Sequence, residues 1–201
     1  MLTLGITGGT GCGKTALLRC IAARGGVTVD CDALYYELLG TDESLRAALI
    51  GAFGAVFLPD GSLDRKALGA RVFSNSEQLA RLNEIVFAHI CCAVQTLQAQ
   101  ARAQGCALFG IDAINLFQSG LAELCDATVG VLAPEHVRVR RITARDGIAE
   151  DYALLRIRAQ EPDDFYRVRC THLLENGEIS PEEFQIKADT LLDQWIKENA
   201  I

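Results

Sequence analysis

Residues 8–15 read Gly8-Gly9-Thr10-Gly11-Cys12-Gly13-Lys14-Thr15, and this stretch decides the fold that we predict. It fits G-x-x-x-x-G-K-[ST], the pattern of a loop that binds the phosphates of a nucleoside triphosphate. A short apolar run, Leu2 to Thr7, comes before it and is typical of a buried strand. A segment with one apolar helical face, Ala16 to Arg24, follows it and ends at two glycines. The sequence therefore predicts the strand, glycine loop and helix that such a site requires.

The residue types of this loop indicate its chemistry. Glycines let successive backbone N–H groups approach phosphate oxygens, and the next helix adds its free amides and positive dipole end. Lys14 is expected to reach the β- and γ-phosphates, and the Thr15 hydroxyl is expected to bind Mg²⁺. Cys12 lies inside the loop, so its oxidation or alkylation is expected to block nucleotide binding. The loop predicts a nucleoside triphosphate but leaves the phosphate acceptor open.

Composition limits the classes of partner. The chain has 201 residues and a formal net charge of −7, so it gains little from general attraction to nucleic acid. No apolar stretch reaches the length of a membrane span, and the first residues enter a strand rather than a signal peptide. We therefore expect a cytoplasmic protein with no nucleic acid or membrane partner, either a monomer or a weak homo-oligomer. The eight cysteines lack C-x-x-C spacing and are expected to be free thiols.

Acidic residues follow two of the predicted strands. Asp30 and Asp32 stand two residues apart on an extended segment, so both would face the cleft above the strand ends. One carboxylate could accept a proton from an attacking hydroxyl while the other helps to hold Mg²⁺ water. The alternative is that one of them only caps the next helix, Ala33 to Leu39. Asp112 ends a third strand, Ala107 to Ile111, and either orients Mg²⁺ water or caps a turn.

The middle of the chain has helical patterns and no strand signal, over roughly residues 41–104. One helix is expected to open at Asp42, a second to be capped by Asp64, and the longest to begin with a capping box at Ser74-x-x-Glu77. This segment is typical of an inserted subdomain that shapes the acceptor site. His89, within the longest helix, is expected to be a polar side chain at the surface rather than a catalyst.

Arginines are concentrated in the helix after the fourth predicted strand. Arg138, Arg141 and Arg145 share one face of it, and a tight turn leads to a second arginine-bearing helix. Such a pair predicts a lid, about residues 138–165, whose guanidinium groups meet phosphate oxygens that gain charge during transfer. We expect this role for Arg141 and Arg145. The alternative, a solvated face of arginines paired with nearby acids, is expected for Arg140, Arg156 and Arg158.

Taken together, these features resemble the dephospho-CoA kinase family, from Leu4 to about Gly177. The phosphate loop alone would be unspecific, whereas the ordered set of motifs is specific. The matching pieces are Thr7 to Thr15, Asp30-Cys31-Asp32, Phe53-Gly54, Asp60-Gly61-Ser62-Leu63-Asp64-Arg65, Leu68, Val72-Phe73, Leu82-Asn83, Arg141-x-x-x-Arg145-Asp146-Gly147, Gln160 and Asn176.

The resemblance implies a three-layer α/β P-loop fold, with a parallel sheet flanked by helices and an all-helical insertion. The nucleotide-binding core would span 1–40 and 105–201 and include the lid, and 41–104 would bind the acceptor. The implied reaction transfers the γ-phosphate of ATP to the ribose 3′-hydroxyl of dephospho-CoA, the last step of coenzyme A synthesis. Asp32 is similar to the family's general base, with Lys14, Arg141 and Arg145 beside it in catalysis. Mg²⁺ is the implied metal.

The remaining site assignments complete this prediction. The phosphate loop, Arg141, Arg145 and Asn176 are predicted to bind the nucleotide. The acceptor is predicted to contact Asp30, Asp32 and Asp112. The implied partner is therefore a small-molecule substrate.

The chain departs from the family's pattern at three places. The usual His-Pro falls at Phe87-Ala88, with His89 displaced. The usual Asp-x-Pro-Leu-Leu-Phe-Glu reads Asp112-Ala113-Ile114-Asn115-Leu116-Phe117-Gln118, and the usual Asp before Asn176 is replaced by Thr171. These changes concern acceptor contacts rather than ATP binding. They keep two alternatives open: another small-molecule P-loop kinase, of nucleoside or nucleotide type, and a nucleotide-binding regulator with weak or no turnover.

Overall fold

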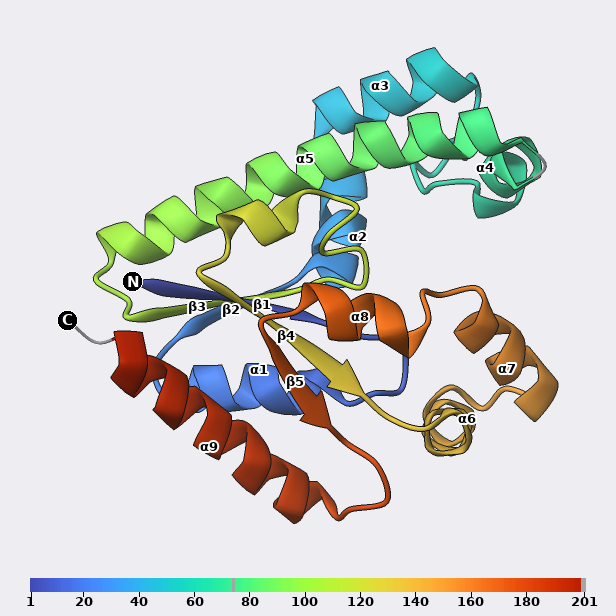
Figure 1. The fold of residues 1–201 in the computed structure, drawn as a ribbon. Helices are drawn as coiled ribbons and strands as arrows, with labels where there is room; N and C mark the ends of the chain where they lie inside the picture. Colours follow the sequence, from blue (N-terminus) through green and yellow to red (C-terminus); the bar gives the residue numbers. More distant parts are fainter. Residues whose placement is uncertain (74, 200–201) are drawn as a thin grey trace.

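The computed structural model of the chain describes residues 1–73 and 75–199. In this part of the chain the strands form one five-stranded parallel sheet in the order β2-β3-β1-β4-β5. Figure 1 shows helices on both sides of this sheet, which confirms the predicted three-layer α/β class. The strands are β1 (Leu2–Thr7), β2 (Val27–Asp30), β3 (Leu108–Asp112), β4 (Ala127–Leu132) and β5 (His172–Glu175).

Helices connect the strands and form the rest of the described fold. The helices before β3 are α1 (Lys14–Ala23), α2 (Cys31–Thr41), α3 (Glu43–Phe53), α4 (Arg65–Val72) and α5 (Ser76–Ala103). The later ones are the short η1 (Leu121–Leu124), α6 (Glu135–Asp146), α7 (Glu150–Arg158), α8 (Asp163–Arg169) and α9 (Pro181–Asn199). The sequence patterns did not predict α8, a short helix with only seven residues. No helix in the described residues is both long and apolar enough to cross a membrane.

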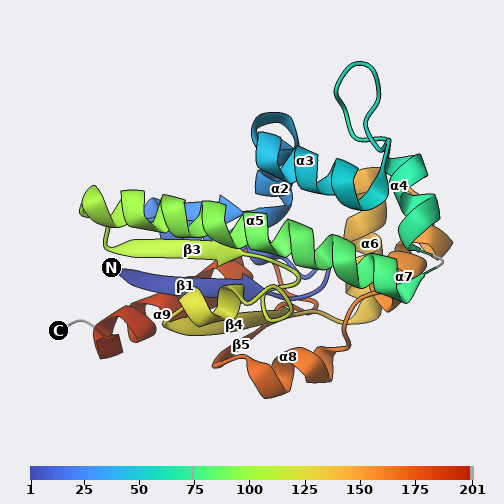
Figure 2. The same cartoon turned by 90° about the horizontal axis from the view of Figure 1, so that it is seen from above.

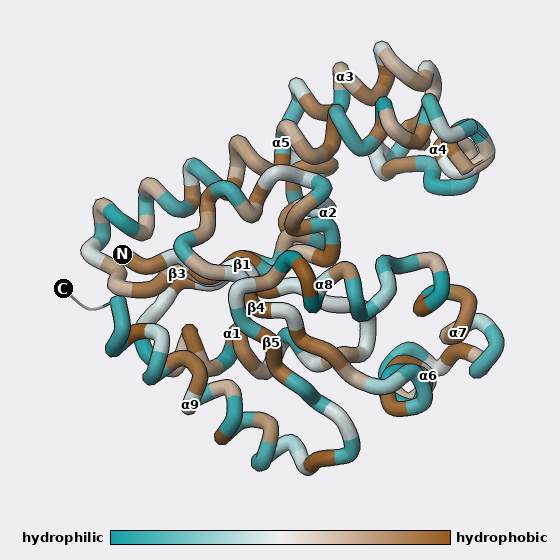
Figure 3. The backbone as a smooth tube through the Cα atoms, viewed as in Figure 1, coloured by the Kyte–Doolittle hydropathy of each residue, from teal (hydrophilic) through white to brown (hydrophobic). Residues whose placement is uncertain are grey.

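Each face of the sheet is covered by its own hydrophobic cluster. Figures 1 and 2 place α5 on one face and α1 with α9 on the other. Leu17 of α1 and Leu192 of α9 pack with the β1 and β4 side chains, whereas Val94 of α5 packs with Ile111 of β3. Figure 3 shows α5 and α9 alternating between hydrophilic and hydrophobic residues, as helices with one buried face do. Burial of these two faces fixes the layer order.

The strand order creates a crevice beside the end of β1. From β1 the chain continues to β2 on one side, and β4 pairs with β1 on the other side. Open parallel sheets bind ligands at such a switch point, beyond the carboxyl ends of the strands. Thr7 at the end of β1 donates from its hydroxyl to the Ile114 carbonyl at 3.1 Å. The phosphate-loop motif and the segment after β3 therefore border one crevice.

A separate hydrophobic cluster builds the helical insertion. Leu45, Leu49 and Phe53 of α3 pack there with buried residues of α2 and α4. The first half of α5 contacts this cluster, whereas its second half covers β3, so one helix joins the insertion to the core. Asn75 caps α5 through the amides of Glu77 and Gln78, and the Ser74 of the predicted capping box lies outside the described residues.

His89 differs from the expected surface position. Its side chain is only 22% exposed, and its Nδ1 lies 2.7 Å from Asp42 Oδ2 at the start of α3. Hydrogen bonds from Ser44, Leu45 and His89 hold the pKa of the Asp42 carboxyl below its usual range. The pair ties α5 to the N-terminus of α3. Because its partner lies 47 residues away, no local pattern indicated it.

Candidate active site

The glycine loop between β1 and α1 presents free amides to the crevice. Gly13 precedes α1 with a φ of 99°, and a Cβ there would collide with the Asn176 side chain, so only glycine fits. No side chain caps the helix. Among the described residues, no group accepts from the amides of Gly13, Lys14 or Thr15. Unpaired amides at a helix N-terminus form an anion site.

Lys14 lies inside this cradle and is largely shielded from solvent. Its Nζ donates to the Gly8 carbonyl at 2.9 Å and lies 3.9 Å from Asp112 Oδ1. Only 12% of its side chain is exposed. A cation held among free amides, in a site with little solvent, is suited to neutralise the charge of a transferring phosphoryl group.

Helix α6 holds the loop through Arg138. This guanidinium is buried, donates from Nε to the Thr10 carbonyl at 2.9 Å and from Nη2 to Gln160 Oε1 at 2.9 Å. Gln160 Oε1 also accepts from the Thr10 amide at 2.9 Å. A Cβ at Gly9 would collide with Arg138, so this glycine permits the close approach. The network fixes the direction of the Thr10 peptide unit.

Arg141 and Asn176 make a second set of contacts to the loop. Arg141 donates to the carbonyls of Gly11, Asn176 and Gly177 at 3.2–3.3 Å, and to Asn176 Oδ1 at 3.0 Å. Asn176 Nδ2 in turn donates to the Cys12 carbonyl at 2.7 Å. With their carbonyls bound on this side, the loop peptides are free to aim amides at the crevice. Asn176 is thus placed behind the loop, and it does not line the cavity.

Replacing Arg138 by alanine is expected to raise the KM for ATP about tenfold or more, because hydrogen bonds to a charged group contribute about 1.5–3 kcal/mol. The exposed Arg140→Ala on the same helix is the matched control and should leave the KM within twofold. Steady-state kinetics at saturating acceptor measures both variants. An unchanged KM for ATP in Arg138→Ala would contradict a role in holding the loop.

A cavity of about 320 Å³ opens in front of the loop. It brings together residues that the sequence places far apart: the loop, the acids after two strands, and the lid arginines. Gly8, Gly9 and Cys12 of the predicted set do not line it and form the back of the loop. The lining residues are Thr10, Gly11, Gly13, Lys14, Thr15, Asp30, Asp32, Asp112, Ile114, Arg141, Arg145, Arg156 and Gln160.

The extended geometry predicted for Asp30 and Asp32 is wrong, and the alternative that one of them caps the next helix is confirmed for Asp30, although both line the cavity. The segment is not extended: α2 begins at Cys31, and Asp30 caps it by accepting from the amides of Asp32 and Ala33 at 2.9 and 3.1 Å. Cap chemistry overrides the extended reading, because a carboxylate at the N-cap satisfies two free amides. Asp32 then lies in the first turn with its carboxyl at the cavity.

Asp32 and Asp112 differ in how strongly their surroundings disfavour charge. Desolvation and the nearby Asp30 carboxylate raise the pKa of Asp32. Asp112 is 9% exposed, and its burial raises the pKa to about 6, with Lys14 opposing the shift. Perturbed carboxyl groups at the mouth of a crevice are typical of functional sites. Asp112 ends β3 and caps no helix in the described chain, so the capping alternative is not supported.

The buried Asp112 carboxyl should destabilise the folded protein above pH 6. Its pKa of about 6 exceeds the ordinary 3.8, so the native state binds this proton more tightly than the unfolded state does. The stability that the protonated Asp112 carboxyl contributes is fully present below pH 4 and is lost as the pH rises through 6. We expect Asp112→Asn to raise the free energy of unfolding at pH 7.5 by up to about 3 kcal/mol, and not at pH 4. Denaturant unfolding at both pH values measures this, and equal differences would contradict it.

The arginines of α6 and α7 nearest the cavity mouth fall into two groups. Arg145 and Arg156 both line the cavity and both bind Asp146, each with a 2.6 Å contact. These hydrogen bonds hold the pKa of Asp146 below its usual range. Arg156 therefore pairs with an acid, as expected. It also lines the cavity, whereas we expected it on a solvated face. Arg158 does lie at the surface, 3.6 Å from Glu135.

Cys12 is less accessible than its place in the loop suggested. Its side chain is 1% exposed, and burial raises the pKa of the thiol. Because the thiolate is the reactive form, both effects oppose alkylation in the folded protein. The predicted loss of nucleotide binding on modification of Cys12 stays a prediction.

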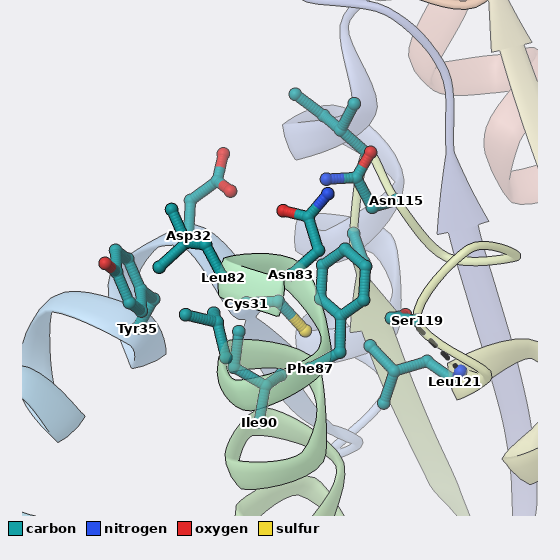
Figure 4. A pocket seen from close by; sticks show the side chains of 13 residues that line it. Cys31, Asp32, Tyr35, Leu82, Asn83, Phe87, Ile90, Asn115, Ser119 and Leu121 are labelled. Carbon is teal, nitrogen blue, oxygen red and sulfur yellow. Dashed lines mark hydrogen bonds between the residues drawn. The ribbon is translucent and has the colours of Figure 1, made fainter. Parts of the chain in front are cut away.

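A second cavity of about 210 Å³ lies beside the first and shares Asp32 and Ile114 with it. Figure 4 shows residues of α2, α5 and the segment after β3 around it. The side-chain amides of Asn83 and Asn115 point toward one another there, and the ring of Phe87 lies next to Asn83. The sequence matched Asn83 only as part of a motif and did not indicate a role for Phe87 or Asn115.

The chain is similar to known proteins over nearly its whole length. A family model described as dephospho-CoA kinase matches residues 2–181. Dephospho-CoA kinase from Anaeromyxobacter dehalogenans is 39% identical over 193 residues, covering 96% of this chain and 91% of the relative. The crystal structure of TT1252 from Thermus thermophilus matches with a TM-score of 0.79 and 30% identity, covering 100% of this chain and 98% of that one. Shikimate kinase from Acinetobacter baumannii, at 14% identity and a TM-score of 0.57 over 100% of this chain and 96% of its own, shares the fold alone.

Proposed function

The chain belongs to the dephospho-CoA kinase family, and we propose that its two adjoining cavities carry out the family's reaction with the residues described above. In that reaction ATP phosphorylates the ribose 3′-hydroxyl of dephospho-CoA and coenzyme A is formed. The observation that carries the proposal is the shared position of Asp32, which lines both the cavity in front of the phosphate loop and the neighbouring one. A hydroxyl bound there would lie between a carboxylate and the end of a triphosphate.

The loop and the lid supply positive charge in this proposal. The amides of Gly13, Lys14 and Thr15 bind phosphate oxygens, and the Lys14 ammonium neutralises the β- and γ-phosphates. Arg141 and Arg145 contribute charge from α6. Arg145 is bound to Asp146 and must exchange it for phosphate, and its side chain is 60% exposed. Phosphoryl transfer depends mainly on such positioning and charge stabilisation.

Asp32 is proposed as the general base. It would accept the proton of the 3′-hydroxyl as the oxygen attacks the γ-phosphorus, and ADP leaves from the loop. Asp30 stabilises this arrangement as the cap of α2, with only Oδ1 engaged by amides. Its remaining oxygen is proposed to contact the acceptor together with Asp112.

Mg²⁺ is proposed to bind with the nucleotide. The Thr15 hydroxyl and the Asp112 carboxylate line one cavity and are the hard oxygen donors that this ion prefers. No group of three or more His, Cys, Asp or Glu residues able to hold a metal occurs within the described ranges, which suits an ion that keeps waters and substrate phosphates as ligands. When bound, the ion would reduce the charge repulsion at the transferring phosphate.

We also propose that different segments of the chain bind the acceptor and the nucleotide. Residues 41–104 would hold the acceptor, with the core at 1–40 and 105–201 and a lid at about 138–165. The hydrophobic cluster of the insertion, separate from those on the sheet, supports such a division. We further propose a cytoplasmic location and a monomer or weak homo-oligomer, which sedimentation velocity at several concentrations would test.

The direct test is to incubate the purified protein with Mg-ATP and dephospho-CoA and to analyse the products by mass spectrometry. We expect coenzyme A and ADP in equal amounts, with the new phosphate on the ribose 3′-oxygen. Turnover of a nucleoside, nucleotide or sugar-like acid in preference to dephospho-CoA would favour a different small-molecule kinase. ATP binding without ADP release for any acceptor would favour a regulator.

A further inference from the structure

Resting on the proposed function, we infer that the second cavity is the subsite for the adenine base of the acceptor, read by the side-chain amides of Asn83 and Asn115. The cavity lies between α2, α5 and the segment after β3 (Figure 4). Nothing in the phosphate-loop chemistry assigns it.

Position is the first argument. Asp32 lines this cavity and the phosphate cavity, so a 3′-hydroxyl at Asp32 leaves its own ribose at the boundary between the two. The base is attached to that same ribose ring. The pantetheine arm begins only beyond the 5′-diphosphate, so it is farther along the molecule. The group that fills the cavity next to the reacting hydroxyl is therefore either the base or the 5′-diphosphate, both of which are attached to this ribose.

Charge is the second argument, and it excludes the diphosphate from this cavity. No lysine or arginine lines it, and Asp32 is the one ionisable carboxylate in its described wall. Burying a diphosphate without a cation and beside a carboxylate is strongly unfavourable. A neutral heteroaromatic ring has no such penalty.

The unused hydrogen-bonding groups are the third argument. In the part of the chain that the structure describes, neither the Asn83 nor the Asn115 side chain bonds to another protein group. A carboxamide offers two donors and an acceptor, which complement the 6-amino group and the ring nitrogens of adenine. The two amides point toward one another across the space that Phe87 also borders.

The apolar walls suit a flat ring. Phe87 presents an aromatic side chain, and Leu82, Val86 and Ile114 contribute aliphatic surface. Bases bind such surfaces by stacking, which contributes about 1–3 kcal/mol per base.

The test compares two acceptors: dephospho-CoA, and an analogue with unsubstituted purine in place of adenine. Wild type should prefer the adenine acceptor in kcat/KM by roughly tenfold or more, because the analogue leaves an amide unpaired. In Asn83→Ala, in Asn115→Ala or in both, this preference should fall toward one. The loss should arise through the KM for the acceptor while the KM for ATP stays within twofold.

Glu84→Ala is the matched control, because Glu84 is exposed on α5 next to Asn83 and does not line the cavity. It should keep the wild-type preference, and thermal unfolding should show that every variant is folded. A wild type without preference, or both asparagine variants with the full preference, would overturn the inference. If the wild type phosphorylated neither acceptor, the proposed function itself would be contradicted.

Discussion

Lys14→Ala is expected to lower kcat by roughly 10³-fold or more, the largest effect of any single change in the loop. The side chain lies between the Gly8 carbonyl and Asp112 and is only 12% exposed, so its charge acts where water screens little. The other cations among the described residues that line the cavity are Arg141, Arg145 and Arg156, which belong to α6 and α7. The loss should be measured as initial rates of ADP release at saturating ATP and acceptor.

Lost activity must be separated from lost folding, because Lys14→Ala leaves the buried Asp112 without its nearest cation. The double variant Lys14→Ala, Asp112→Asn removes both charges and should restore the free energy of unfolding without restoring turnover. Lys187→Ala, at an exposed position of α9 that does not line the loop cavity, is the control for loss of one lysine. A Lys14→Ala protein with more than about a tenth of wild-type kcat would rule out its role in charge neutralisation.

Asp32→Asn is expected to lower kcat by roughly 10²–10⁴-fold, the usual contribution of a positioned general base. The amide keeps the shape of the side chain at the first turn of α2 but cannot accept the proton. ATP affinity, measured by calorimetry, should change less than twofold, since within the described residues no hydrogen bond or ion pair joins the Asp32 carboxyl to the phosphate loop. Glu37→Gln, an exposed acid on the same helix, is the control.

The pH dependence gives this variant a second signature. The pKa of Asp32 is raised above its ordinary value, so the wild-type kcat should fall with decreasing pH as this carboxyl is protonated. In Asp32→Asn that acidic limb should be absent. A variant that keeps both the wild-type rate and the acidic limb would show that another group takes the proton.

Local patterns predicted the elements that local chemistry determines. The β1–loop–α1 unit follows from an apolar run, glycines and an amphipathic segment, each readable within a few residues. The start of α9 is likewise determined locally, because Ser180 and Glu183 exchange reciprocal hydrogen bonds there. The family resemblance and the α/β class are confirmed by the comparisons and the sheet.

Local sequence patterns did not predict the long-range contacts that hold the loop. The Thr10–Gln160 hydrogen bond joins residues 150 positions apart, and the Arg138 contact to Thr10 spans 128. Neither residue type signals such a partner, because arginine and glutamine are ordinary surface residues. The error at Asp32 has a different cause: periodicity extended the strand through this residue, whereas Asp30 ends β2 and caps α2, so the helix begins at Cys31.

The groups at the centre of the site lower the stability of the folded protein. A buried carboxyl whose pKa is about 6 lies 3.9 Å from a shielded ammonium, and a loop of free amides faces them. Such groups destabilise the protein without ligand and are retained where the chemistry requires them. Bound nucleotide should therefore raise the thermal stability of the wild type by mass action.

A crystal structure of the protein with a non-hydrolysable ATP analogue and dephospho-CoA tests the central claim most directly. The account predicts the triphosphate on the amides of residues 13–15, with the ribose 3′-oxygen within hydrogen-bond distance of Asp32 and facing the γ-phosphorus. A triphosphate bound outside the glycine loop, or a 3′-oxygen remote from Asp32, would contradict it.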